Sequence, residues 1–224
     1  MAATSDTEND DMKKIVAGVE IPDSAMARAA ADQVRAIESE LMFRHAVRAF
    51  LFGALAGHRG QMTFDAELLY VGAMFHNVGL SAEHQRSPYR FEVDGANAAR
   101  EFLRQHGAPE RSIEEVWEAI ALHTTPGLPE HMPGIVALVS AGVQMDVRGA
   151  RYDDFTARQR DEIVQAFPRE AGFKKKIIEA YARGMEHRPE TTFGTVNADV
   201  LDRSDPNYRR LNFCGLVLGS DWPT

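Results

Sequence analysis

Cysteine is almost missing from the sequence, whose 224 residues include a single one, Cys214. A disulfide within the chain is therefore excluded, and so is a metal site built from cysteines. Chains without disulfides are typical of reducing compartments, which leads us to expect a cytoplasmic protein. The first residues, MAATSDTENDDMKK, are polar and acidic and do not have the pattern of a signal peptide.

Long hydrophobic runs and an excess of positive charge are missing as well. No run approaches the roughly eighteen apolar residues of a membrane helix, so we expect no membrane span. With 25 Lys and Arg against 33 Asp and Glu, the net charge of −8 argues against a nucleic-acid-binding surface. No P-loop, dinucleotide-binding glycine motif or G-x-S-x-G elbow occurs. We expect a small-molecule substrate as the partner, with a homodimer as an alternative use of wide apolar helix faces.

Strand-like alternation is also absent, whereas apolar residues recur with a helical period almost throughout. The sequence predicts an all-α fold, a single-domain bundle of roughly eight to ten helices. We assign residues 1–20 to an N-terminal tail, disordered over 1–14, and residues 21–224 to one helical domain. Loops are expected over 80–91 and 126–134. The expected helices cover 23–39, 41–57, 65–79, 92–107, 112–125, 135–149, 156–166, 170–187, 193–203 and 207–218.

Several of these apolar helices each contain a histidine or an acid, which is an expensive residue to bury without a partner. His45 lies within LMFRHAVRAFLFG, His76 and Asn77 end an apolar helix, His123 follows AIAL, and Asp146 comes late in IVALVSAGVQMDVRG. Imidazole nitrogens and carboxylate oxygens that converge inside a helical bundle are the ligands that Zn²⁺, Fe or Mn requires. The other histidines have structural explanations at helix ends and in loops.

The order His45, His76-Asn77, Asp146 resembles the HD-domain superfamily of metal-dependent hydrolases, named after a His-Asp doublet at the end of a helix. The segments FRHAVRAFLFG, ELLYVGAMFHNVGL, RFEVDGANAAR and AIALHTT match too, and most resemble the cyanamide-hydratase-type branch. The resemblance covers about residues 24–205. It implies an all-α site with one divalent metal ion, Zn²⁺ first with Fe or Mn as alternatives, bound by His45, His76 and Asp146. His123 would be a further ligand or a substrate contact.

Asn77 stands where the family has the aspartate of its doublet. An amide offers a neutral carbonyl oxygen in place of a charged one and cannot bridge two metals as a carboxylate does. A two-metal centre is therefore disfavoured, metal affinity should fall, and any ion that stays bound should be a stronger Lewis acid. Asn77 fits a natural variant in a working enzyme, an engineered inactivating change, or a family member that binds without turnover.

The site predicted from these patterns has three groups of residues. We assign catalytic roles to Asn77 and His123. The metal ligands are His45, His76, Asp146 and, weakly, Asn77. Polar residues in the loop after the doublet and at later helix ends are candidates for substrate binding, namely Arg86, Glu92, Thr124 and Asn197.

The function predicted from the resemblance is the addition of metal-activated water to a small polar molecule, as in nitrile hydration by cyanamide hydratases. Three alternatives stay open. One is an HD phosphohydrolase acting on a nucleotide or phosphate ester, for which Arg44, Arg48, Arg86 and Arg90 are the candidate cations. Another is a di-iron oxygenase, which would require Asp at position 77. The last is a non-catalytic binding protein with a decayed metal site.

Overall fold

The computed structural model describes residues 14–222 and confirms the all-α class. The expected disordered tail falls mainly on residues 1–13, which lie outside the described residues. Five short 3₁₀ helices join the main elements: η1 (Val78–Leu80), η2 (Ala82–His84), η3 (Pro129–His131), η4 (Tyr152–Asp154) and η5 (Pro189–Thr192). The α-helices of the described part are α1 (Ala25–Ile37), α2 (Glu40–Arg59), α3 (Ala66–Phe75), α4 (Phe91–Gln105), α5 (Glu110–Leu122), α6 (Gly134–Arg148), α7 (Ala157–Ala166), α8 (Phe173–Met185), α9 (Asn197–Ser204) and α10 (Phe213–Leu218).

A small hairpin corrects the expectation of a tail up to residue 20. Strands β1 (Ile15–Val16) and β2 (Val19–Glu20) pair in antiparallel fashion. The two turn residues, Ala17 and Gly18, both have positive φ, which is the geometry of a tight two-residue hairpin turn. Val16 and Val19 are buried against the bundle. Four residues of strand are too few to give a periodic signal, so the sequence pattern does not reveal them.

Two helix boundaries near the candidate site differ from the sequence prediction. The helix expected over 65–79 ends at Phe75, and residues 78–80 form η1 instead. The helix expected over 193–203 begins only at Asn197, where α9 starts, and the residues just before position 193 form η5. The apolar pattern extends past the regular helix in both places, because it does not mark where the backbone turns.

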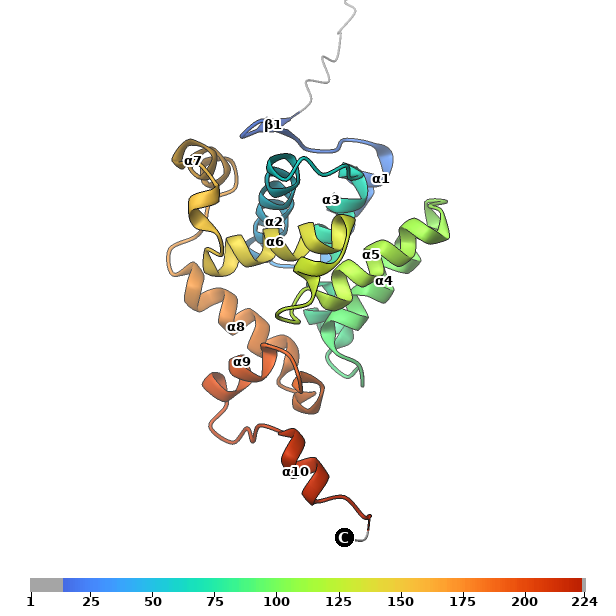
Figure 1. Ribbon diagram of the computed structural model, residues 1–224, viewed down its shortest axis with the longest axis vertical. Coiled ribbons are helices and arrows are strands. Elements are labelled where there is room, and N and C mark those ends of the chain that lie inside the picture. The colour runs from blue at the N-terminus through green and yellow to red at the C-terminus, as the bar shows by residue number, and fades with distance from the viewer. Residues whose placement is uncertain (1–13, 223–224) are drawn as a thin grey trace, which may run out of the picture.

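The centre of the bundle is the contact between α2 and α6, which lie across each other in the upper half of Figure 1. Glycines permit this close approach. A Cβ at Gly142 would lie 1.9 Å from the carbonyl oxygen of Ala49, and one at Gly53 would lie 2.6 Å from that of Leu138. The backbones of the two helices therefore touch, and this contact fixes His45 on α2 opposite Asp146 on α6.

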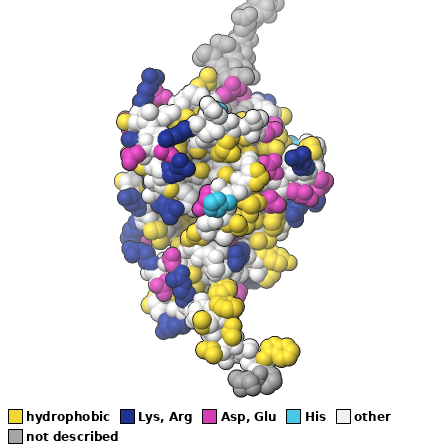
Figure 2. Space-filling view, viewed as in Figure 1, with side chains coloured by type: hydrophobic (Ala, Val, Ile, Leu, Met, Phe, Trp, Pro, Cys, Tyr) yellow, Lys and Arg dark blue, Asp and Glu magenta, His cyan; other side chains and the backbone are white. Residues whose placement is uncertain are grey.

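The lower part of the molecule holds α8 and α9, which pack on each other below the central helices (Figure 1). Helix α10 projects away from them. Its side chains are exposed although they are apolar, with Phe213 at 70% and Leu218 at 87% (yellow at the bottom of Figure 2). Within residues 14–222, no helix is both long and apolar enough to cross a lipid bilayer.

Candidate functional site

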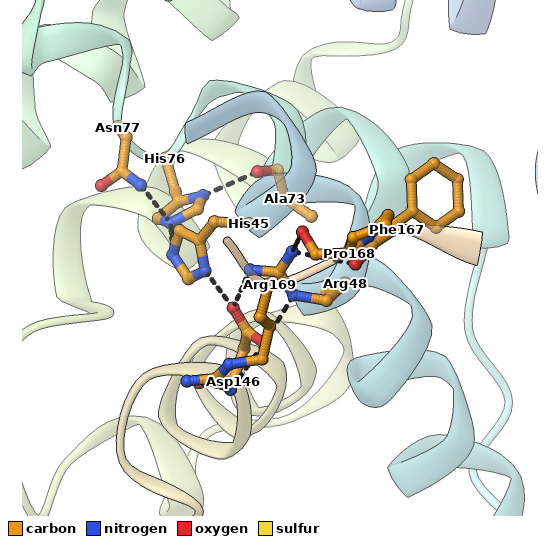
Figure 3. A network of polar contacts seen from close by, with 9 residues as sticks. All are labelled: His45, Arg48, Ala73, His76, Asn77, Asp146, Phe167, Pro168 and Arg169. Atoms are coloured by element: carbon orange, nitrogen blue, oxygen red, sulfur yellow. Dashed lines mark hydrogen bonds and ion pairs between the residues drawn. The ribbon is translucent and has the colours of Figure 1, made fainter. Parts of the chain in front are cut away.

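His45 and Asp146 form the base of the candidate site, where α2 meets α6. The Nδ1 atom of His45 lies 2.7 Å from Oδ2 of Asp146, and neither side chain is exposed. Arg48, one turn after His45, donates to both oxygens of Asp146 over 2.8 and 2.9 Å (Figure 3). Arg169 adds a contact of 3.3 Å to Oδ1. Asp146 is therefore the shared acceptor of a buried imidazole and two guanidinium groups.

These contacts control the ionisation of Asp146. Burial acts to raise the pKa of its carboxyl group, but hydrogen bonds and charges from His45 and Arg48 outweigh burial and lower the pKa to about 2. Asp146 is thus a carboxylate at neutral pH. Such a partner fixes Nδ1 of His45 as the protonated nitrogen and leaves Nε2 with a lone pair.

His76 is the C-cap residue of α3, and its ring faces that of His45 (Figure 3). Its Nδ1 donates to the carbonyl oxygen of Ala73 over 2.6 Å, which satisfies one of the free carbonyl groups at the helix end. The other nitrogen, Nε2, lies 3.1 Å from Nε2 of His45 and 2.7 Å from the side-chain nitrogen of Asn77. Burial is the main cause of a pKa of His76 well below its usual value, so the ring is neutral.

Nε2 of His45 therefore presents its lone pair to Nε2 of His76, whose own lone pair accepts from the amide of Asn77 as that amide is oriented. Such a contact is repulsive unless a proton or a cation lies between the nitrogens. Two nitrogens bound to one tetrahedral ion at about 2.0–2.1 Å lie roughly 3.4 Å apart, close to the 3.1 Å between His45 and His76. Asn77 adds an amide at the same point. Its orientation follows from the hydrogen-bond assignment, and turning it over would place its oxygen where its nitrogen now lies.

His123 repeats the arrangement of His76 at the end of α5. Its Nδ1 donates to the carbonyl oxygen of Ile120 over 2.6 Å, and its ring centroid lies 5.0 Å from that of His76. Its Nε2 is buried and has no hydrogen-bond partner among the described residues. Burial, as the largest cause, lowers the pKa of His123, which opposes protonation of that nitrogen.

Three of the four expected substrate-binding residues also come together. Oε1 of Glu92, in the first turn of α4, accepts hydrogen bonds from the hydroxyl of Thr124 and, over 2.7 Å, from the amide of Asn197 at the start of α9. All three are buried. Arg86 is not part of this cluster, because it is exposed in the loop after η2, where water solvates its charge.

The sequence analysis missed three residues that border the site. Arg48 was considered only as a phosphate-binding cation, although it lies one turn after His45 on the same helix. Tyr181 on α8 hydrogen-bonds with the side chain of Asn77, and burial raises the pKa of its phenol. Glu38 precedes α2, and both of its carboxyl oxygens are buried without a partner in the described part of the chain. Only Arg48, at its helical spacing from His45, left a signal in the sequence.

These residues fit a metal ion in part. The paired Nε2 atoms of His45 and His76, together with the unpartnered oxygen of Asn77 and Nε2 of His123, are buried acceptors that a cation would satisfy. Asp146, however, is occupied by Arg48. Within residues 14–222 no three side chains of His, Cys, Asp or Glu are grouped so that they could hold one ion. The fit therefore rests on two imidazoles, and further ligands have to come from Asn77, from a shift of His123 or Asp146, or from solvent.

The comparison with protein families agrees with this geometry. The model of the HD domain matches residues 42–189, which is more than half of the chain. The matched segment includes the histidines at 45, 76 and 123 and the acid at 146, and it ends before Asn197. No curated protein sequence matches the chain.

Proposed function

The chain belongs to the HD-domain family, whose members are mostly metal-dependent hydrolases, and we propose that it adds water to a small polar molecule with the help of one divalent ion. The cyanamide-hydratase type of reaction, hydration of a nitrile-like carbon, is the form we favour. The observation that carries the proposal is the pair of facing Nε2 atoms on His45 and His76. Both rings have Nδ1 bound to an oxygen, as metal-ligating histidines usually do.

His45 and His76 would hold the ion, which we expect to be Zn²⁺, with Fe or Mn as alternatives. An ion bound there supplies a water molecule whose pKa is lowered towards about 7. Asp146 fixes the tautomer and the orientation of His45, and Arg48 holds Asp146 in place. The amide of Asn77 now donates to Nε2 of His76, so it would have to turn over or shift before that nitrogen could hold the ion. An amide does not take up a proton, so Asn77 cannot replace an aspartate as a base.

The burial of the site supports a small substrate. None of His45, His76, Asn77 and His123 is more than 1% exposed. A pocket of about 590 Å³ is lined by Thr125, two residues after His123, and by Gln144, but by none of these four side chains. We infer that a substrate approaches through this pocket, because its lining residue Gln144 lies 3.5 Å from the backbone carbonyl oxygen of His123.

Hydrolysis of phosphate esters fits this site less well, because the candidate arginines have other partners. Arg48 binds Asp146, Arg44 binds Glu40, and Arg90 donates to the carbonyl oxygen of Phe193. Arg86, the fourth candidate, is exposed in the loop after η2 and is not part of the cluster around Glu92, so it does not supply a buried cation for a phosphate. The oxygenase alternative still requires a bridging carboxylate at position 77, and a binding protein with a decayed site is the outcome if no metal binds.

Metal analysis tests the proposal directly. The wild-type chain and the Asn77→Asp variant are purified after growth with added Zn²⁺, Fe or Mn, and metal is measured per chain. We expect about one ion per chain in the variant and less in the wild type, and none in His45→Ala/His76→Ala. His131→Ala, which removes an exposed histidine, is the matched control and should leave the metal content unchanged. The proposal is wrong if neither the wild type nor Asn77→Asp binds metal.

A substrate panel then separates the reaction types. Small nitriles, cyanamide among them, are assayed beside phosphate monoesters with the metal-loaded Asn77→Asp variant and with the wild type. Hydration of a nitrile supports the favoured reaction. Release of phosphate from the esters alone would replace it with the phosphohydrolase alternative.

A further inference from the structure

Glu92, unlike the buried acids Asp94 and Asp146, has no cationic partner among the described residues, a condition it shares with Glu38 before α2. Asp94 forms an ion pair with Arg188, and Asp146 forms ion pairs with Arg48 and Arg169. Glu92 is 0% exposed, yet no Lys or Arg of the described residues forms an ion pair with it. Burying a carboxylate without a cationic partner costs on the order of several kcal/mol of folding free energy. Asp94 and Asp146 offset this cost through their ion pairs with arginine.

The groups around Glu92 satisfy only half of its carboxyl group. Oε1 accepts from the Thr124 hydroxyl and the Asn197 amide, both of which are neutral donors. Oε2 is buried and has no partner in the described part of the chain. No Lys or Arg of the described residues donates to either oxygen of Glu92.

Three further buried acceptors without partners belong to residues close to Glu92. They are Oδ1 of Asn77, Nε2 of His123 and Oδ1 of Asn197. Asn197 contacts Glu92 directly, Thr124 joins Glu92 to the end of α5, and His123 packs against His76, the neighbour of Asn77. We call these four residues, Asn77, Glu92, His123 and Asn197, the acceptor cluster. Every open position in it needs a donor, and none needs an acceptor.

A metal ion alone does not satisfy this cluster. Within residues 14–222, Glu92 does not group with the histidines as ligands of one ion. An ion between His45 and His76 would therefore leave the Glu92 oxygen unpaired. A molecule that combines positive charge with several N–H bonds would satisfy both the carboxyl group and the neighbouring acceptors.

We propose that the acceptor cluster binds a small organic cation of the ammonium or amidinium type, which donates N–H bonds to Oε2 of Glu92 and to the amide oxygen of Asn197. The proposal deepens the function proposed above, because it names the substrate class of the same site. Only the reaction that the bound molecule undergoes rests on that function; the binding itself does not. The cation would place its neighbouring carbon on the side of the cluster where His76 and Asn77 lie. Recognition by charge-assisted hydrogen bonds would also explain why a carboxyl group is retained at this depth.

Three probes of nearly equal shape test the charge and the donors. Acetamidinium carries a positive charge and four N–H bonds, acetamide is neutral with two, and acetate is negative with none. Their binding to the full-length chain, treated with chelator so that no metal binds acetate, is measured by NMR titration at matched ionic strength. We expect acetamidinium to bind at least tenfold more tightly than acetamide, and acetate not to bind. Equal affinity of acetate and acetamidinium, or no binding of acetamidinium, would overturn the proposal, and water would then fill the open positions.

A variant pair places the binding at Glu92. In Glu92→Gln the affinity for acetamidinium should fall at least tenfold while that for acetamide changes less than twofold. Glu83→Gln removes an exposed carboxylate on η2 and should change neither affinity. Should Glu92→Gln fail to fold, the wild-type probe series decides alone. An unchanged acetamidinium affinity in folded Glu92→Gln would contradict the assignment.

The two proposals can fail separately. If the metal analysis finds no ion but acetamidinium still binds, the hydratase proposal is wrong and the cation site stands. If metal binds as expected but acetate binds as well as acetamidinium, the cation site is wrong and the metal proposal stands.

Discussion

His76 and His123 occupy equivalent positions at the ends of two helices. Each is the C-cap of its helix with nearly the same backbone angles, φ −60° and ψ −24° for His76 and φ −61° and ψ −23° for His123. Each ring donates through Nδ1 to the carbonyl oxygen three residues earlier. The helix end thus selects the tautomer, and both rings keep Nε2 as an acceptor, which is open in His123 and contacted by the amide of Asn77 in His76.

The amide at position 77 should limit metal affinity. In Asn77→Asp a carboxylate replaces a neutral oxygen beside His76, and an added negative charge at a buried cation site is strongly favourable. We expect the affinity for Zn²⁺ to increase by at least about tenfold, roughly 1.4 kcal/mol, measured by competition with a chromogenic chelator. Asn207→Asp adds the same charge at an exposed position and should have no effect. An equal affinity in Asn77→Asp and the wild type would show that residue 77 does not contact the ion.

Arg48 should be essential for stability, whereas its neighbour Arg44 should not. Arg48→Met leaves the carboxylate of Asp146 buried with a weaker set of partners, which costs about 3–5 kcal/mol of unfolding free energy. Arg44→Met, one turn earlier on α2, breaks only the partly exposed pair with Glu40, and we expect a loss below about 1 kcal/mol. Urea denaturation of both variants measures the difference. Similar losses in the two variants would mean that Arg48 contributes little beyond its side-chain packing.

The buried carboxyl group of Glu38 should make stability depend on pH. Burial raises its pKa from the ordinary value of 4.5 to about 8. Between these values the folded chain holds the proton and the unfolded chain releases it, so the free energy of unfolding falls as pH rises. The slope reaches at most about 1.4 kcal/mol per pH unit and vanishes below pH 4.5 and above pH 8.

Glu38→Gln should remove this slope, because an amide does not titrate. Relative to the wild type, the variant should gain stability between about pH 5 and pH 8 in urea denaturation, in line with the shifted pKa. Glu83→Gln, which removes an exposed carboxylate, is the control and should follow the wild type. A Glu38→Gln curve parallel to that of the wild type would show that the carboxyl group reaches water.

The close contact between α2 and α6 should not tolerate a methyl group. A Cβ at Gly142 would overlap the backbone oxygen of Ala49, whereas one at Gly72 on α3 would meet a side-chain atom of Val139 at 3.1 Å. Gly142→Ala should therefore lose at least about 2 kcal/mol, since the helices have to separate. Gly72→Ala should be near neutral, because the gain in helix propensity of about 1 kcal/mol offsets the crowding. Thermal unfolding of both variants tests this, and a stable Gly142→Ala would mean that α2 and α6 can move apart freely.

The sequence predicts the fold class and the set of buried polar residues well, for physical reasons. Apolar residues with a helical period define the helices, and a histidine or an acid inside such a pattern stands out against it. That signal singled out His45, His76, His123 and Asp146, all of which the structure buries. Glu92, Thr124 and Asn197 are candidates in the sequence only as polar residues after the doublet and at later helix ends, and they lie together although more than a hundred residues separate the first from the last.

Long-range pairings could not be predicted in the same way. The ion pair between Arg48 and Asp146 joins two helices, and the sequence of neither helix predicts how the two are rotated relative to each other. Tyr181 has no polar pattern around it that would connect it with Asn77. The early end of α3 depends on a hydrogen bond from the His76 ring to Ala73, which the apolar pattern of the segment cannot reveal.

The complete burial of the candidate site should affect how fast a ligand can enter and leave it. Because the rings of His45, His76 and His123 are closed off from solvent, a substrate reaches them only when the surrounding segments separate. The Pro- and Gly-rich segment 126–134 follows His123 in the chain and contributes Pro126, Gly127 and Glu130 to the pocket described above, so we expect it to be one of the segments that move. The turnover rate would then depend on how often these segments separate. Solvent viscosity and the composition of segment 126–134 would therefore affect that rate, in addition to the chemical step.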